Sequence, residues 1–305
     1  MITPSSKDRI FPVWKPQMMT STDVVRKIKN KFNLNKIGHG GTLDPLAEGV
    51  LPIAIGKTTK LIPFINRDIK EYEFEIKWGE QTSTDDREGN IVEKSSNIPS
   101  HHEINLKLKN FTGKILQTPP KASAVKINGV RSYKLFRLNT NFENKKKYVY
   151  VYESKILDST KKNITKIMIK CGKGFYVRSF ARDLAEQLGT KGHIFSLKRT
   201  KVGKFCLKNA ILLDDLLKIR QTHFEFRDIH PSISMLDDIL AVEIDDEKLI
   251  QKISQGKSVK IDPNLFSQKT LNLDEKITVF LTCKKNVLSY GKFTGCLFKP
   301  QKVLI

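Results

Sequence analysis

Residues 36–61 read KIGHGGTLDPLAEGVLPIAIGKTTKL, and the rest of the chain is organised around this stretch. Three glycines, at positions 38, 40 and 41, surround His39, and glycine lets the backbone approach a ligand closely or adopt positive φ. Pro45 disfavours the α conformation at Asp44, so we expect a stiff loop to hold the Asp44 carboxylate. The apolar run at 50–55 then predicts a buried strand.

Spacing alone leaves two interpretations of Asp44 open. An Asp-Pro pair is typical of a helix start, with Asp44 as N-cap and Pro45 as the first helical residue. Gly49 and Pro52 follow closely, so such a helix would be very short. The alternative is a catalytic carboxylate on a glycine-rich loop. A phosphate-binding P-loop ending at residues 56–58 is excluded, because no glycine precedes it at the required spacing.

The 305-residue chain is strongly basic, with 54 Lys and Arg against 32 Asp and Glu and a formal net charge of +22. This excess favours a polyanionic partner, with nucleic acid as the first candidate. Solvated lysines on an ordinary surface would give the same count. The length is sufficient for one large or two smaller domains.

The four cysteines are scattered, without a CxxC pair or a histidine at ligand spacing, so we expect neither a zinc site nor a disulfide framework. The N-terminal residues lack the apolar segment of a signal peptide, and no run approaches the ~20 apolar residues of a membrane span. We therefore expect a soluble, cytoplasmic protein.

The segment at 38–60, GHGGTLDPLAEGVLPIAIGKTTK, is similar to the signature of the TruB family, the bacterial tRNA pseudouridine synthases that isomerise uridine 55 in the T loop. The resemblance implies that Asp44 is the catalytic aspartate and that His39 lies beside the flipped nucleotide. It implies an α+β fold with a mixed, mainly antiparallel sheet and flanking helices, followed by a small β-rich PUA-like domain. No cofactor is expected.

The same resemblance suggests the domain organisation and the partners. We expect the catalytic domain at 1–238, with an RNA-gripping insertion around 104–150, and the PUA-like domain at 239–305. Short strands are predicted at 277–282 and 287–298 in that last part. The expected partner is the T-arm stem-loop of tRNA, bound by a monomer without an obligatory protein partner. A non-catalytic RNA-binding protein and a guide-RNA-dependent synthase are the rival interpretations.

Near the N-terminus, FPVWKPQMMTSTDVVRKIK resembles the first motif of the family and implies Lys15 as a substrate contact. Met18 stands where the family usually has glycine, which leaves the shape of this loop open. Thr20 and Asp23 have the spacing of a capping box and predict a helix start.

Residues 70–76 alternate with period two, as in a half-buried strand, and Tyr72 shares a face with two apolar residues. An ordinary core aromatic fits this pattern, whereas the resemblance makes Tyr72 the tyrosine that stacks on the target base. The turn GEQTSTDDREGNI follows, and its acids are expected to serve the turn.

The segment PPKASAVKINGVRSYKLFR mixes lysine and arginine with Tyr133, a combination that grips a nucleic-acid backbone. The pattern also fits a solvated basic face; the resemblance favours RNA contact, with Lys126 among the contacting residues.

Further on, CGKGFYVRSFARDLAEQLG predicts a helix with Ser179 as N-cap that ends at Gly189. Tyr176 and Arg178 would lie at the end of a strand just before this helix, and Arg178 could be a simple surface charge. The resemblance instead implies Tyr176 as a substrate contact, Arg178 as the partner of Asp44, and Leu197 beside the bound base. A guanidinium near a desolvated carboxylate favours its ionised form, which is the role expected of Arg178.

Overall fold

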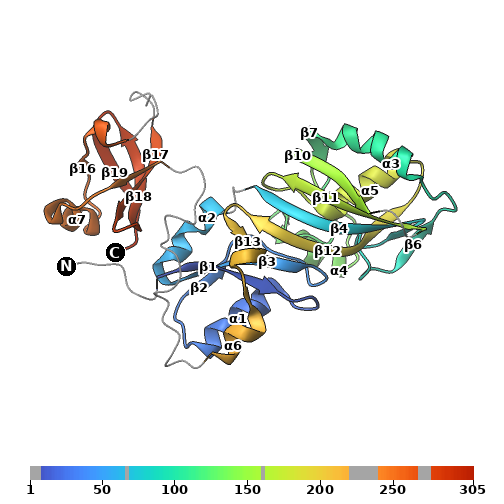
Figure 1. Cartoon of the computed structure of the whole chain (residues 1–305), viewed down its shortest axis with the longest axis horizontal. Coiled ribbons are helices and arrows are strands. Elements are labelled where there is room, and N and C mark those ends of the chain that lie inside the picture. The colour runs from blue at the N-terminus through green and yellow to red at the C-terminus, as the bar shows by residue number, and fades with distance from the viewer. Residues whose placement is uncertain (1–7, 66–68, 159–161, 220–239, 267–275) are drawn as a thin grey trace.

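A ten-stranded sheet forms the centre of the first part of the chain (Figure 1). The computed structural model describes residues 8–65, 69–158, 162–219, 240–266 and 276–305. The strands of this sheet are β1 Ile10–Lys15, β2 Ile37–His39, β3 Glu48–Ile55, β4 Lys70–Trp78, β7 Gly113–Gln117, β10 Lys147–Asp158, β11 Ile164–Cys171, β12 Gly192–Val202, β13 Phe205–Cys206 and β14 Ile211–Leu212.

The sheet is mixed and mainly antiparallel, as the family resemblance implied. Its order is β14-β1-β3-β12-β4-β11-β10-β7, with β2 paired to β3 and β13 paired to β12. The β1–β14 and β3–β12 pairs are parallel, and the remaining pairs are antiparallel. Two small hairpins lie outside it: β5 Glu80–Thr82 with β6 Ile91–Lys94, and β8 Lys126–Ile127 with β9 Val130–Arg131.

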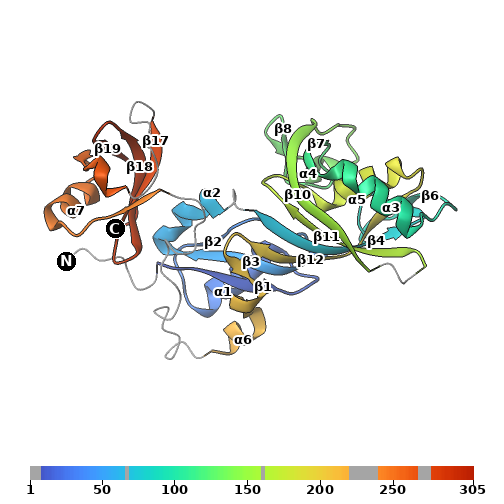
Figure 2. The ribbon, with the colours of Figure 1, turned by 45° about the horizontal axis from the view of Figure 1, so that its top comes forward.

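Helices cover the sheet in two groups (Figure 2). The helices of this part are α1 Ser21–Lys31, α2 Ile62–Ile65, α3 His101–Leu108, α4 Ser132–Arg137, α5 Val177–Gln187 and α6 Leu213–Lys218. Short 3-10 segments are η1 Gly56–Leu61, η2 Lys109–Phe111 and η3 Leu207–Asn209. Side chains of α3 and α5 share one apolar core with β4, β10, β11 and β12, and α1 and α6 share another with β1 and β3.

Strand β4 has the predicted alternation. Tyr72, Phe74 and Ile76 are buried, and their neighbours are partly exposed. The Phe74 ring meets Phe180 of α5 edge to face, with the ring centroids 5.7 Å apart. This packing fixes α5 against the centre of the sheet.

The helix starts confirm one sequence prediction and correct another. The Thr20 hydroxyl accepts from Asp23 N–H at 3.0 Å and the Asp23 carboxylate accepts from Thr20 N–H at 3.1 Å, which is the predicted capping box. Ser179 is not an N-cap, because α5 already begins at Val177. Ser179 lies buried in the first turn and donates to Thr118 O at 2.7 Å.

The C-terminal part is a small β-rich domain, as expected. Its elements are β15 Ala241–Glu243, α7 Glu247–Ser254, β16 Val259–Lys260, η6 Pro263–Leu265, β17 Ile277–Cys283, β18 Asn286–Thr294 and β19 Leu297–Val303. The strand order is β15-β17-β18-β19-β16. The single strand predicted at 287–298 is wrong: β18 and β19 are separate strands, joined by a turn in which Gly295 has φ 59°.

Aromatic rings join this domain to α2. Phe64 meets Phe280 and Tyr290 edge to face, each with ring centroids 4.8 Å apart. The predicted domain boundary at 238–239 lies outside the described residues, so it stays a prediction. Within the described ranges, no helix combines the length and apolar character required to cross a bilayer.

Candidate active site

Asp44 lies on a loop that the surrounding backbone holds on both sides. Residues 40–47 form no helix, so the N-cap interpretation of Asp44 is wrong. Before it, Leu43 N–H donates to the Ser21 hydroxyl at 2.9 Å, and that hydroxyl donates to Leu43 O at 3.1 Å. After it, the Pro45 carbonyl accepts from Met18 N–H at 2.8 Å. Met18 has φ 60°, so it adopts the conformation that glycine would favour at this position.

Lys15 lies beneath this loop, away from open space. It is fully buried, and its ammonium donates to the carbonyls of Pro16 at 2.8 Å, Met19 at 2.6 Å and Pro45 at 3.4 Å. Burial lowers the pKa of Lys15 to about 8, against the opposing charge of Asp44. Lys15, which the resemblance made a substrate contact, therefore supports the Asp44 loop. It lines neither the inner cavity nor the outer hollow described below.

Arg178 reaches Asp44 across the fold. Its Nε lies 2.9 Å from Asp44 Oδ2 and 3.6 Å from Asp86 Oδ2, without the angle of a true hydrogen bond. The two terminal nitrogens donate to Thr84 O and to Ala122 O, each at 3.0 Å. The guanidinium therefore meets Asp44 through one nitrogen, and the bidentate geometry that an arginine can offer a carboxylate is absent here.

Charges around Arg178 keep its guanidinium protonated. Burial alone would lower the pKa of Arg178, but the carboxylates of Asp44, Asp86 and Asp85 outweigh this effect and raise it. Asp86 also serves the turn, as predicted, because its Oδ1 accepts from the Thr84 hydroxyl at 2.6 Å. The turn that follows β5 thus stabilises itself and supplies a second acid to Arg178.

An inner cavity of about 350 Å³ opens beside Asp44, within the size range of small-ligand sites. Its walls include Tyr72 from β4, Leu197 from β12, and Tyr176 and Arg178 at the start of α5. Gln117 brackets Tyr176, since it accepts from Tyr176 N–H at 2.8 Å and donates to Tyr176 O at 3.0 Å. Five of the predicted site residues therefore surround one space.

An outer hollow of about 590 Å³ shares Asp44 and Arg178 with the inner cavity. His39 lines it, together with Arg131, Tyr133 and Arg137 of the insertion. Burial lowers the pKa of His39, and the charge of Arg199 lowers it further. Lys126 is exposed on the β8–β9 hairpin and lines neither the cavity nor this hollow.

Arg199 is a site residue that the sequence reasoning did not assign. It is 1 % exposed and lies opposite Tyr72 in the β4–β12 register. Its Nε donates to Val50 O at 2.8 Å and its Nη2 to Gly41 O at 2.9 Å, so it ties β12 to the Asp44 loop. A signal was present: the strand alternation puts Arg199 on the same buried face as Leu197.

Comparison with known proteins places this geometry in a family. Residues 29–177 match the family model described as TruB family pseudouridylate synthase (N terminal domain), and residues 178–241 match tRNA pseudouridylate synthase B C-terminal domain. A tRNA pseudouridine synthase B from Bartonella bacilliformis is 38% identical over 95% of this chain and 93% of its own length. One from Ehrlichia ruminantium is 41% identical over 85% of this chain and 88% of its own length.

The chain belongs to the TruB family. It is therefore a pseudouridine synthase, which is an isomerase. The fold agrees: the Cbf5 chain in a Cbf5-Nop10-Gar1 complex superposes with a TM-score of 0.75 over 98% of this chain and 86% of its own length, at 24% identity. The C-terminal β domain corresponds to the expected PUA-like domain.

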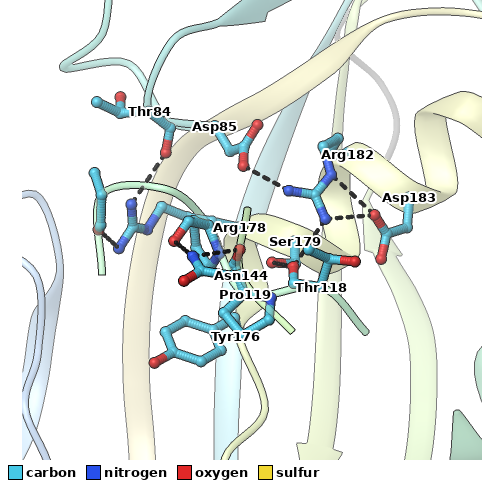
Figure 3. A network of polar contacts seen from close by, with 12 residues as sticks. Thr84, Asp85, Thr118, Pro119, Asn144, Tyr176, Arg178, Ser179, Arg182 and Asp183 are labelled. Atoms are coloured by element: carbon cyan, nitrogen blue, oxygen red, sulfur yellow. Dashed lines mark hydrogen bonds and ion pairs between the residues drawn. The ribbon is translucent and has the colours of Figure 1, made fainter. Parts of the chain in front are cut away.

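In this TruB chain, side chains from the first two turns of α5 contact both the β5–β6 turn and the segment that follows β7 in the insertion (Figure 3). Arg182 donates to Asp85 Oδ2 at 3.0 Å and to Thr118 O at 2.9 Å, one helical turn after Arg178 makes the parallel contacts. Asn144 donates to Pro119 O at 3.2 Å and to Pro120 O at 2.8 Å. A larger hollow of about 760 Å³ is lined by residues of this network, including Asp85, Thr118 and Arg182. Asp44 is not part of its lining.

The site of this TruB chain is built from oxygen, nitrogen and aromatic groups of the protein. Across the described part of the chain, no group of three or more His, Cys, Asp or Glu side chains is arranged to hold a metal ion. The four cysteines are all unpaired thiols. The polar side chains that line the inner cavity include Asp44, Arg178, Tyr72, Tyr176 and Arg199.

Proposed function

We propose that this chain isomerises uridine 55 in the T loop of tRNAs to pseudouridine, with Asp44 as the catalytic carboxylate. The relatives named tRNA pseudouridine synthase B support tRNA as the substrate. The observation that carries the mechanism is the 2.9 Å contact between Asp44 and Arg178 at the point where the inner cavity meets the outer hollow.

The two hollows suit a nucleotide that leaves its helix. A stacked uridine is out of reach in a stem-loop, so it must be flipped into a pocket with apolar and aromatic walls. Tyr72 and Leu197 offer such walls in the inner cavity. Arg131, Arg137 and Tyr133 in the outer hollow would hold the phosphates and bases on either side of the flipped nucleotide.

The reaction requires cleavage of the bond between ribose C1′ and uracil N1, rotation of the uracil, and formation of a bond from C1′ to C5. Asp44 would attack ribose C1′ or uracil C6, or assist formation of a glycal, and these three routes remain alternatives. Arg178 would hold the Asp44 carboxylate at the cavity wall through their 2.9 Å contact. C5 finally loses a proton and N1, freed from C1′, gains one, so the isomerisation balances without another reactant.

Tyr72 would stack on the base and relay the C5 proton. Burial raises the pKa of Tyr72, and the charge of Arg199 opposes this effect. The phenol is therefore neutral at neutral pH. Since the Tyr72 hydroxyl carries both a proton and lone pairs, it can pass on a proton without becoming ionised first.

The decisive assay is tritium release from C5-labelled uridine in an unmodified T-arm hairpin, with pure protein and without guide RNA or partner protein. Asp44→Asn should abolish release and leave hairpin affinity and thermal stability nearly unchanged. Asp215→Asn is the matched control, because Asp215 is an exposed acid on α6, and it should retain full activity. Appreciable turnover by Asp44→Asn would refute the assignment, and inactive wild-type protein that binds the hairpin would favour the non-catalytic rival.

A further inference from the structure

Three tyrosines of β10 form an exposed row, which we call the tyrosine ladder: Tyr148, Tyr150 and Tyr152. Their side chains are 65%, 47% and 47% exposed, whereas Val149 and Val151 between them are buried. Large aromatic side chains grouped on a surface commonly mark an interaction site. The described residues that pack against β10 leave these rings open to solvent.

The backbone of β10 is shaped to present this row. The β10–β11 register shifts between Val151 and Glu153, so Tyr152 is the extra residue of a β-bulge. A bulge redirects a side chain and often lies next to a functional site. The alternation of residues 148–152 already puts Tyr152 on the outer face, the register shift comes at the end of this row, and the ring centroids of Tyr150 and Tyr152 lie 4.7 Å apart.

Positive charge accompanies the aromatic surface. Lys114 Nζ of β7 lies 4.4 Å from the centroid of Tyr148, and Lys114 is directly opposite Tyr150 in the β7–β10 register. The acid of this region, Glu153, is paired with Lys155 at 3.7 Å. Flat rings beside a lysine ammonium suit bases and phosphates of single-stranded RNA, and exposed aromatics on a sheet face serve this purpose in RNA-binding domains.

The ladder borders the inner cavity but points away from it. Gly172 N–H donates to Tyr150 O at 2.8 Å, and the next two residues, Lys173 and Gly174, line the cavity. Val151 and Tyr72 belong to the core on the other face of the sheet. A nucleotide in the cavity cannot touch the ladder, so bases that reach the ladder must belong to another segment of the RNA.

We propose that the tyrosine ladder stacks unpaired bases of the substrate tRNA that lie outside the T arm. This inference rests on the proposed function for the identity of the RNA. It makes the ladder a second contact, which strengthens the binding of whole tRNA and is not engaged by an isolated arm.

The test compares two RNAs and two triple variants. Tyr148→Thr/Tyr150→Thr/Tyr152→Thr removes the rings but keeps residues that favour strands, and the corresponding Phe variant keeps the rings. We expect the Thr variant to raise the Kd for an unmodified full-length tRNA about tenfold or more, and to change the Kd for the T-arm hairpin by less than about twofold. The Phe variant should bind both RNAs like the wild type.

Three outcomes would contradict the ladder as an RNA site outside the T arm. If the Thr variant binds tRNA as tightly as the wild type, the ladder more plainly suits a protein partner. The proposal also fails if the Thr variant loses affinity equally for both RNAs, or if the Phe variant loses as much tRNA affinity as the Thr variant. If the Thr variant melts early, Tyr150→Thr alone should still weaken tRNA binding about fivefold. The Kd measurements do not depend on catalysis. Wild-type protein that fails to isomerise uridine 55 would therefore contradict the proposed function, while the comparison of tRNA and hairpin binding would remain valid.

Discussion

The Arg178 guanidinium serves Asp44 and two backbone carbonyls with one planar group. Its Nε faces Asp44, while its terminal nitrogens donate to Thr84 O and Ala122 O. Lysine has a single charged nitrogen on a flexible stem and cannot meet all three partners at once. The charge alone is therefore not sufficient, and the shape of the guanidinium matters.

Arg178→Lys should lower kcat/KM for the T-arm hairpin by about 100-fold or more, because the Asp44 carboxylate loses a fixed partner and two partly buried carbonyls lose donors. Tritium release measures the effect. Arg26→Lys is the matched control, since Arg26 is exposed on α1 and pairs only with Asp23 among the described residues. Retention of more than about half the activity by Arg178→Lys would show that geometry at this nitrogen is unimportant.

His39 predicts a pH dependence of stability. Because the folded-state pKa of His39 lies below its ordinary value, the unfolded chain binds a proton more readily than the folded chain as the pH falls below about 6.5. The wild type should lose stability in that window with a slope of at most about 1.4 kcal/mol per pH unit from this group. His39→Gln cannot bind the proton, so its loss should be shallower.

Urea unfolding of the wild type and His39→Gln at pH 7.5 and pH 5.5 gives the free energy of unfolding of each protein. Because all other groups titrate alike in the two proteins, a change in the difference between them reports on His39. If the free energies of unfolding of the wild type and His39→Gln differ by the same amount at both pH values, His39 titrates normally in the folded chain.

At the residue scale, five of the predicted site residues line the inner cavity, but the sequence did not show which groups they contact. The family resemblance brought Asp44 and Arg178 together, and the structure puts them 2.9 Å apart. Only Nε of Arg178 faces Asp44, because its two terminal nitrogens donate to Thr84 O and Ala122 O. The positions of these carbonyls are fixed by tertiary structure. The burial of Lys15 was not predictable for the same reason, because sequence does not reveal which carbonyls surround a buried amine.

At the scale of elements, α5 joins two segments that are far apart in sequence. Arg182 pairs with Asp85 of the β5–β6 turn and binds Thr118 O at the base of the insertion. Both side chains are largely buried, at 17% and 10% exposure. Burial raises the pKa of Asp85 despite Arg182, so the pair has a desolvation cost and its coupling energy is the quantity to measure.

A double-mutant cycle with Arg182→Met and Asp85→Asn should give a coupling energy of about 1–3 kcal/mol in urea unfolding. Asparagine suits position 85 because the residue there has φ 60°. The exposed pair Lys218 and Asp215 on α6 offers the control cycle, expected below about 0.5 kcal/mol. Equal coupling in the two cycles would contradict a structural role for the Arg182 pair.

Element boundaries were predictable where the signal is local. The Thr20 capping box is complete within four residues, so the start of α1 was readable. The start of α5 was not, because Gln117, 59 residues earlier, satisfies the backbone of Tyr176 in place of a local cap. The break between β18 and β19 was missed because apolar residues continue on both sides of Gly295.

At the scale of the whole molecule, the sequence predicted a large sheet domain and a small β domain but not how they meet. Strand patterns are independent of sheet order, and the parallel β3–β12 contact brings together segments about 150 residues apart. The contact of Phe64 with Phe280 and Tyr290 is equally non-local. Such pairings arise from packing, which no local pattern encodes.

Phe64→Ala should uncouple the C-terminal domain from the catalytic domain. Leu304 and Val287 share an apolar cluster with residues of β1 and β3, and Phe64 packs against that cluster. Truncation to alanine removes both edge-to-face contacts, worth about 0.5–1.5 kcal/mol each beyond the lost burial. Differential scanning calorimetry should then show a separate C-terminal transition at lower temperature. Phe32→Ala truncates a partly buried ring in the α1 cluster instead, so it should lower the main transition without splitting it. A single shifted transition in both variants would mean that the domains are held together by contacts other than these rings.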